Sequence, residues 1–157
     1  MEIIDNHRSA VLRKKYINSF INTHSAIYIQ YISKLTQYKD GLCYQGYLWD
    51  CFVDANNISE KECLRQLTKF TYFWVFWDIH SCENILIPNY WKYPKTAVLR
   101  MDYEEYLKLA PTLPEDIYCF DETFKWSIAL THEFVGSNRF CYFAHPACES
   151  IVDQSIQ

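Results

Sequence analysis

The segment Phe70-Thr71-Tyr72-Phe73-Trp74-Val75-Phe76-Trp77 is the most apolar run of the chain, and it decides how the remaining segments can be arranged. Aromatic and β-branched side chains at successive positions suit a pleated backbone that is buried on both faces. The run is far too short to cross a bilayer, which takes about 20 residues. It therefore predicts a central β-strand. After a loop, the shorter run Ile85–Ile87 stops at Pro88 and is predicted to pair with this strand as a hairpin.

Further strands are predicted on the C-terminal side of this segment. Residues 117–120 and 124–132 flank a turn and are typical of an antiparallel pair, and residues 139–144 predict a last strand. Before this group, Asp102 precedes a helical stretch near residues 102–110, whose first acidic side chains complement the positive end of the helix dipole. These segments predict a mostly antiparallel sheet with one helix inserted.

Helices are predicted on the N-terminal side. From Asn6 to Leu35 apolar residues recur at helical spacing, and residues 23–25 divide this stretch into two helices. Residues 47–52 are too apolar for a surface loop and predict a short packed helix or strand. Ser59, with a glutamate three residues later, predicts the N-cap of a helix that ends near Leu67.

The expected fold is α+β, with N-terminal helices packed on one face of a mostly antiparallel β-sheet. No repeat, low-complexity tract or linker divides the chain, so residues 1–157 are expected to form a single domain. Within it, residues 1–67 are expected to be mainly helical and residues 70–144 mainly sheet, with one helix near 102–110. Residues 145–157 are expected to be a polar tail.

Composition limits the classes of function. The three glycines are far apart, which argues against a loop that cradles phosphate groups. The seven cysteines are odd in number and irregularly spaced, and residues 1–13 contain no apolar run of signal-peptide length. We therefore expect reduced thiols and a cytoplasmic protein. No cofactor is expected.

Charge is distributed unevenly along the chain. Residues 70–157 carry 12 acidic and six basic side chains, and seven of these acids fall between Arg100 and Glu122. Such a surface repels nucleic acid and anionic lipid, so neither is an expected partner. It favours a cationic protein instead. The run Arg13-Lys14-Lys15 is expected to be the solvated side of a helix rather than a nucleic-acid site.

The predicted partner-binding residues combine these acids with neighbouring aromatic side chains, because Tyr and Trp are common anchors of protein interfaces. Asp116, Asp121 and Glu122 flank the predicted hairpin and are expected to be turn-forming, solvated acids. The full predicted set is Asp102, Glu104, Glu105, Asp116, Asp121, Glu122, Tyr90 and Trp91.

The spacing Cys141-x3-His145-x2-Cys148 is the pattern in the chain that most resembles a metal site. Two thiolates and one imidazole can supply three of the four tetrahedral ligands of zinc, and the fourth would be His132 or Cys82. Closed zinc sites normally contain two paired clusters, and only one is present here. The sequence therefore favours Cys141 as a core residue, with His145 and Cys148 in the tail and no metal bound.

Thr131-His132-Glu133 offers an imidazole next to a carboxylate, which could form a general base beside the thiol of Cys119 or Cys141. Adjacent residues of a strand point to opposite faces, so His132 and Glu133 are not expected to share a site unless the strand ends between them. No catalytic residue is predicted. We expect His132 to close the sheet by hydrogen bonding. A metal- or thiol-dependent enzyme that uses His132, Cys141, His145 and Cys148 is the alternative.

Four segments resemble parts of small bacterial proteins of unassigned function that are similar to toxin immunity proteins, including those of contact-dependent growth inhibition systems. The segments are Asp40–Tyr44, Gly46–Cys51, Leu113–Trp126 and Thr131–Glu133. The resemblance implies a non-enzymatic cytoplasmic antidote that binds one secreted toxin domain from a rival cell and blocks its active site. It implies no catalytic residue.

Overall fold

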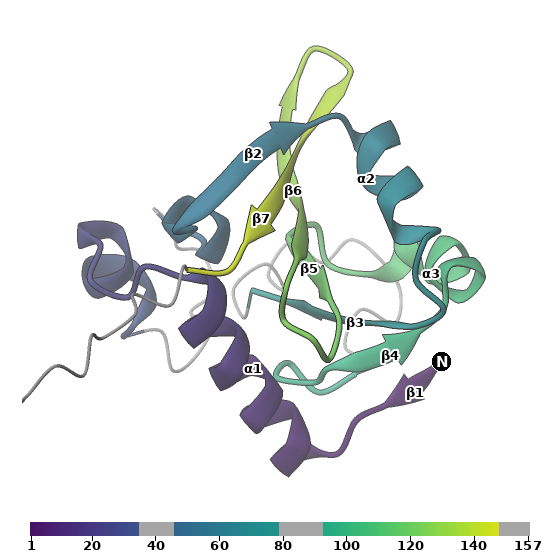
Figure 1. The fold of residues 1–157 in the computed structure, drawn as a ribbon, viewed down its shortest axis with the longest axis horizontal. Coiled ribbons are helices and arrows are strands. Elements are labelled where there is room, and N and C mark those ends of the chain that lie inside the picture. The colour runs from purple at the N-terminus through teal and green to yellow at the C-terminus, as the bar shows by residue number, and fades with distance from the viewer. Residues whose placement is uncertain (35–45, 79–92, 148–157) are drawn as a thin grey trace, which may run out of the picture.

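A computed structural model of the chain describes residues 1–34, 46–78 and 93–147. The α+β class is confirmed: helices pack on a seven-stranded antiparallel sheet with the strand order β1-β4-β3-β5-β6-β7-β2 (Figure 1). The strands are β1 (Glu2–Ile3), β2 (Asp54–Ile58), β3 (Phe73–Trp77), β4 (Leu99–Met101), β5 (Ile117–Phe120), β6 (Ser127–Val135) and β7 (Asn138–His145).

Strand β3 is the predicted central strand, and all five of its residues are buried. It pairs antiparallel with β4 on one side and with β5 on the other. The segment Ile85–Ile87, which the sequence predicted as the hairpin partner of this strand, lies outside the described residues. The predicted antiparallel pair β5–β6 and the last strand β7 are confirmed.

Strand β2 was not among the elements that the sequence predicted. It pairs along its whole length with β7, with Asp54 opposite His145 and Ile58 opposite Cys141. Its sequence, DANNI, has no alternation of apolar residues and is rich in residue types that strands disfavour. The ladder to β7 stabilises it as an edge strand, and such long-range pairing leaves no local signal in the sequence.

Three α-helices begin at side-chain caps. Helix α1 (Asn6–Phe20) follows Asp5, whose carboxylate accepts from the backbone N–H of Arg8. Helix α2 (Glu60–Leu67) follows the predicted cap Ser59. Helix α3 (Tyr103–Leu109) follows Asp102 and is closed by a reciprocal capping box with Glu105. Each cap satisfies a backbone N–H that the first turn of a helix leaves without a partner.

Shorter helical turns complete the described structure. The second predicted N-terminal helix is a single π-helical turn, Tyr28–Ile32, with no fully buried residue. Residues 48–51 form a 3₁₀ turn, η2 (Leu48–Cys51), which agrees with the prediction of a short packed element. A second 3₁₀ turn, η5 (Ala110–Thr112), follows α3. Among the described residues, no helix is long and apolar enough to cross a membrane.

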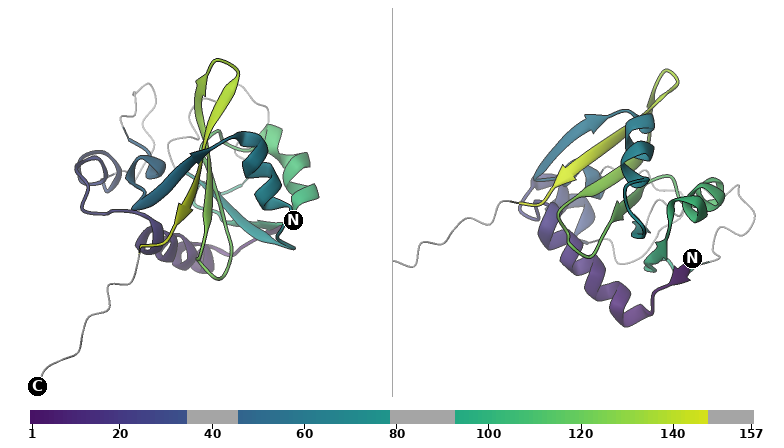
Figure 2. Two further views of the ribbon diagram at one scale, coloured as in Figure 1. Left: turned by 45° about the horizontal axis from the view of Figure 1, so that its top comes forward. Right: turned by 45° about the vertical axis from the view of Figure 1, so that its right-hand side comes forward.

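The sheet separates two hydrophobic cores. Figure 2 shows how the ribbons of the helices lie around the sheet. Helix α1 covers one face, where Tyr16 and Phe20 pack with Phe76 of β3. Helices α2 and α3 cover the opposite face, where Leu67 and Tyr106 pack with alternate residues of β3. An N-terminal helix therefore covers one face as expected, and the sequence did not predict the second layer of helices.

Candidate functional site

Most of the predicted partner-binding acids lie beyond the ends of two strands, on the same side of the sheet's strand ends. Met101 at the end of β4 is opposite Phe73, and Phe120 at the end of β5 is opposite Trp74. The residues that follow, Asp102 and Asp121, therefore leave the sheet at the same end of the strands. Only β3 separates β4 from β5, so their backbones lie about 10 Å apart. We call the five acids at these strand ends the acidic rim: Asp102, Glu104, Glu105, Asp121 and Glu122.

Three acids of the rim have local structural roles. Asp102 and Glu105 cap α3, at 2.8 and 3.1 Å from the backbone nitrogens that they accept from, and Glu105 also contacts the N-terminal ammonium of Met1. Asp121 accepts from the backbone N–H of Thr123 at 3.0 Å. Glu104 and Glu122 are exposed and form no ion pair with any residue that the structure describes.

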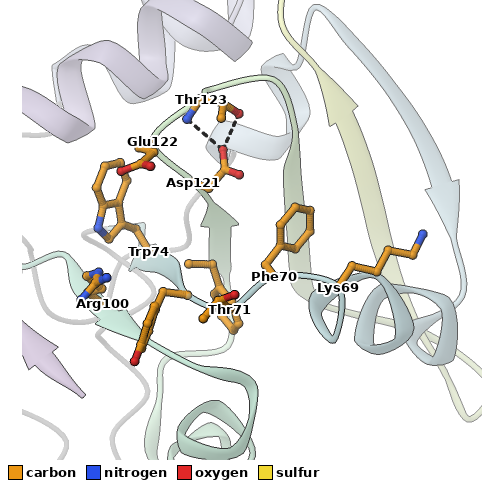
Figure 3. A pocket seen from close by; sticks show the side chains of 10 residues that line it. Lys69, Phe70, Thr71, Trp74, Arg100, Asp121, Glu122 and Thr123 are labelled. Carbon is orange, nitrogen blue, oxygen red and sulfur yellow. Dashed lines mark hydrogen bonds between the residues drawn. The ribbon is translucent and has the colours of Figure 1, made fainter.

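A half-open pocket of about 360 Å³ adjoins the rim (Figure 3). The turn after β5 contributes the carboxylates of Asp121 and Glu122, while Lys69 and Arg100 contribute cations. The guanidinium of Arg100 lies 4.2 Å above the ring of Tyr72, which is 48% exposed. The pocket thus combines both signs of charge with an exposed aromatic ring.

Asp116 does not belong to this surface, which corrects its predicted place among solvated, partner-facing acids. Its residue exposure is only 2%, and it lies at the start of β5, at the other end of that strand. Its carboxylate accepts from the indole nitrogen of Trp49 at 3.1 Å and from the backbone N–H of His132 at 3.0 Å. The ring nitrogen Nδ1 of His132 lies 2.9 and 3.0 Å from the two carboxylate oxygens.

A second buried carboxylate, Asp78, lies next to Asp116, and the sequence did not single it out. The hydroxyl of Tyr118 donates to it, and its backbone N–H donates to the carbonyl of Asp116 at 3.3 Å. The pKa of Asp78 is raised to about 7, chiefly because burial disfavours the charged form. The Asp116 carboxylate adds to the shift, whereas the hydrogen bond from Tyr118 and the charge of Arg13 oppose it.

Arg13 is half-buried, so the prediction that the run Arg13-Lys14-Lys15 is solvated is wrong for its first residue. Its guanidinium donates to the carbonyl oxygen of Trp77 at 3.1 Å and lies 4.5 Å from the centroid of the Phe76 ring. The cation therefore lies at the end of β3, next to Asp78, and partly offsets the charge of that carboxylate. Lys14 and Lys15 are exposed, as predicted.

The cysteine and histidine candidates are dispersed. Cys141 is fully buried, as expected for a core residue, and hydrogen-bonds with Cys63. This contact raises the pKa of Cys63 and lowers that of Cys141. His145 is exposed. Cys82, Cys148, Tyr90 and Trp91 lie outside the described residues. Within the described residues, no group of three or more His, Cys, Asp or Glu side chains is arranged to hold a metal ion.

The prediction that His132 closes the sheet by hydrogen bonding agrees with its contacts, but the sequence did not identify Asp116 as the partner. The two residues are 16 positions apart in the sequence. The available signal was the antiparallel pairing of 117–120 with 124–132, which brings the residues before the first strand next to those that end the second. Comparison with protein-family models, with curated proteins and with solved structures found no match to the chain.

Proposed function

We propose that this chain is an immunity-type protein of the bacterial cytoplasm that binds a secreted, cationic toxin domain and blocks its active site. The observation that carries the proposal is the acidic rim, where Glu104 and Glu122 are exposed beside a pocket that contains an exposed Tyr72. The resemblance of four sequence segments to toxin immunity proteins supports the same function.

The rim suits a basic protein surface for electrostatic reasons. Five carboxylates surround the end of β4, the start of α3 and the turn after β5. The cations near them include the ammonium of Met1, which contacts Glu105, and Lys69 and Arg100, which line the pocket with Asp121 and Glu122. An acidic surface of this kind accelerates encounter with a cationic partner, and its effect declines as salt is added. Tyr72 is placed to provide an aromatic contact within the same surface. Tyr90 and Trp91 lie outside the described residues, and they remain predicted anchors of the interface.

Reversal of the two exposed rim charges, Glu104→Lys with Glu122→Lys, is expected to slow association with the toxin domain by about tenfold or more at low salt. The rate should also depend less on ionic strength, because the steering field is weakened. Association of the purified chain with the product of the reading frame directly upstream, followed by surface plasmon resonance, measures both quantities.

The matched control is Asp54→Lys with Glu133→Lys, which makes the same change in charge on exposed residues of β2 and β6, away from the rim. Its association rate should stay within about twofold of the unchanged chain. Equal slowing in the two variants would mean that only net charge matters, and it would remove the rim as the binding surface.

A further inference from the structure

The turn η2 (Leu48–Cys51) is anchored in different ways at its two ends. Its C-terminal end is joined to the end of α1 by backbone bonds. The N–H of Asn22 donates to the carbonyl of Cys51 at 2.7 Å, and the N–H of Val53 donates to the carbonyl of Phe20 at 2.9 Å. These bonds do not involve a titratable side chain, so this end is fixed at all pH values at which the chain is folded.

The N-terminal half of η2 is held on the sheet by two buried carboxylates, Asp78 and Asp116, which we call the acid pair. The backbone N–H of Leu48 hydrogen-bonds with Asp78, and the indole nitrogen of Trp49 donates to Asp116 at 3.1 Å. The backbone N–H of Trp49 donates to the hydroxyl of Tyr118 at 3.1 Å, and that hydroxyl donates to Asp78. Three donors from two consecutive residues of the turn therefore end on the acid pair or on its tyrosine.

The acid pair is one buried charge site. Asp78 and Asp116 are 3% and 2% exposed, and the backbone N–H of Asp78 donates to the carbonyl of Asp116 at 3.3 Å. Burial and a neighbouring like charge both disfavour a second negative charge at such a site. Asp116 is already an acceptor for the indole of Trp49 and the backbone N–H of His132. The proton of the pair is therefore expected on Asp78.

The charged and titratable groups of the described residues that face the acid pair come from α1, η2, β5 and β6. They are Arg13, Tyr16, Asp50, Cys51, Tyr118 and His132. Burial raises the pKa values of Tyr16, Tyr118 and Cys51, so these three groups are neutral at and below pH 7. The charge of Arg13 lowers the pKa of Asp78 and opposes the effect of burial.

We propose that the acid pair is a pH-sensitive latch for η2. When Asp78 loses its proton to solvent, the second buried charge favours an open form in which the N-terminal half of the turn leaves the sheet and water reaches both carboxylates. The bonds to Asn22 and Phe20 keep the C-terminal end in place as the hinge. This proposal does not rest on the immunity function.

The direction of the pH effect follows from the folded environment of Asp78. Its bonds from Tyr118 and Leu48 favour the charged form, but burial prevails, and the pKa of Asp78 is raised from 3.8 to about 7. In the open form water solvates the carboxyl group, which returns its pKa towards the ordinary value. Between about pH 4 and pH 7 the closed form thus holds a proton that the open form has released. The opening equilibrium constant should rise by up to about tenfold per pH unit in this range and level off above it.

Hydrogen exchange of the backbone amides of Leu48 and Trp49, followed by NMR at pH 5, 6 and 7, measures this opening. After correction for the intrinsic effect of pH on exchange, their protection should fall by about 50-fold from pH 5 to pH 7. It should also be lower than that of the β3 amides at each pH, because the turn opens without global unfolding. The amides of α2, on the opposite face of the sheet, are the internal control, and their protection against local opening should change little.

Asp78→Asn has nearly the same shape and does not titrate in this range, so it should reduce the pH-dependent loss of protection in η2 to about threefold or less. Trp49→Phe removes the indole donor to Asp116 and should lower the protection of η2 about tenfold at every pH, with the pH dependence retained. If Asp78→Asn folds poorly, the comparison of η2 with α2 in the unchanged chain decides.

Three results would each overturn the latch. The first is protection of Leu48 and Trp49 that does not change from pH 5 to pH 7. The second is protection equal to that of the β3 amides at every pH, because the turn would then open only when the whole chain unfolds. The third is a folded Asp78→Asn variant that keeps the full pH dependence.

Discussion

Asp116→Ala is expected to lower the free energy of unfolding by about 2–4 kcal/mol, because a buried donor that loses its acceptor costs about 1–3 kcal/mol. The carboxylate accepts from the buried indole nitrogen of Trp49 and from the backbone and ring nitrogens of His132. Alanine supplies no acceptor to either residue. The relief of repulsion between Asp116 and Asp78 offsets part of this loss.

Chemical denaturation of the unchanged chain, Asp116→Ala and Asp121→Ala measures this effect. Asp121 is a partly exposed acid that accepts within its own turn, so its replacement should cost about 1 kcal/mol or less. Similar losses in the two variants would show that Asp116 is no more important to the fold than a turn residue, and would contradict the buried network.

The second large effect is a dependence of stability on pH that arises from Asp78. Its pKa in the folded protein is about 7, against an ordinary value of 3.8. Between these values the folded chain holds a proton that the unfolded chain has released, so the free energy of unfolding falls as pH rises. The contribution of Asp78 is fully present below about pH 4 and decreases by about 4 kcal/mol by the time pH exceeds 7.

Asp78→Asn should remove this dependence, because the amide does not titrate in the range. The informative quantity is the difference in free energy of unfolding between the unchanged chain and the variant, measured at intervals from pH 4 to 8. The contributions of the other titrating groups cancel in this difference. Relative to the variant, the unchanged chain should become less stable as pH rises. A difference that stays constant from pH 4 to 8 would contradict the buried, proton-holding carboxyl.

Local patterns predicted the elements that have local causes. Within the apolar segment 70–77, residues 73–77 are buried on both faces and form β3 in the interior of the sheet, whereas Thr71 and Tyr72 are exposed. Ser59 and Asp102 were recognised as caps because capping depends on residues three positions apart. The alternation before and after the turn at 121–123 likewise predicted β5 and β6.

What could not be predicted depends on contacts between distant residues. Strand β2 is held by its partner β7, about which its own residues carry no information. Asp116 follows a proline and a glutamate and has the pattern of a turn, but Trp49, 67 residues earlier, donates to it in the interior. The pair His132–Asp116 is brought together by the register of β5 and β6, and neither residue has a distinctive neighbour in the sequence.

The most direct test of the proposed function is growth of bacteria that express the reading frame immediately upstream, with and without this chain in the same cytoplasm. The account predicts that the upstream product arrests growth, that this chain restores growth, and that Glu104→Lys with Glu122→Lys restores it less well than Asp54→Lys with Glu133→Lys. An upstream product that does not affect growth, or an arrest that this chain does not relieve, would contradict it.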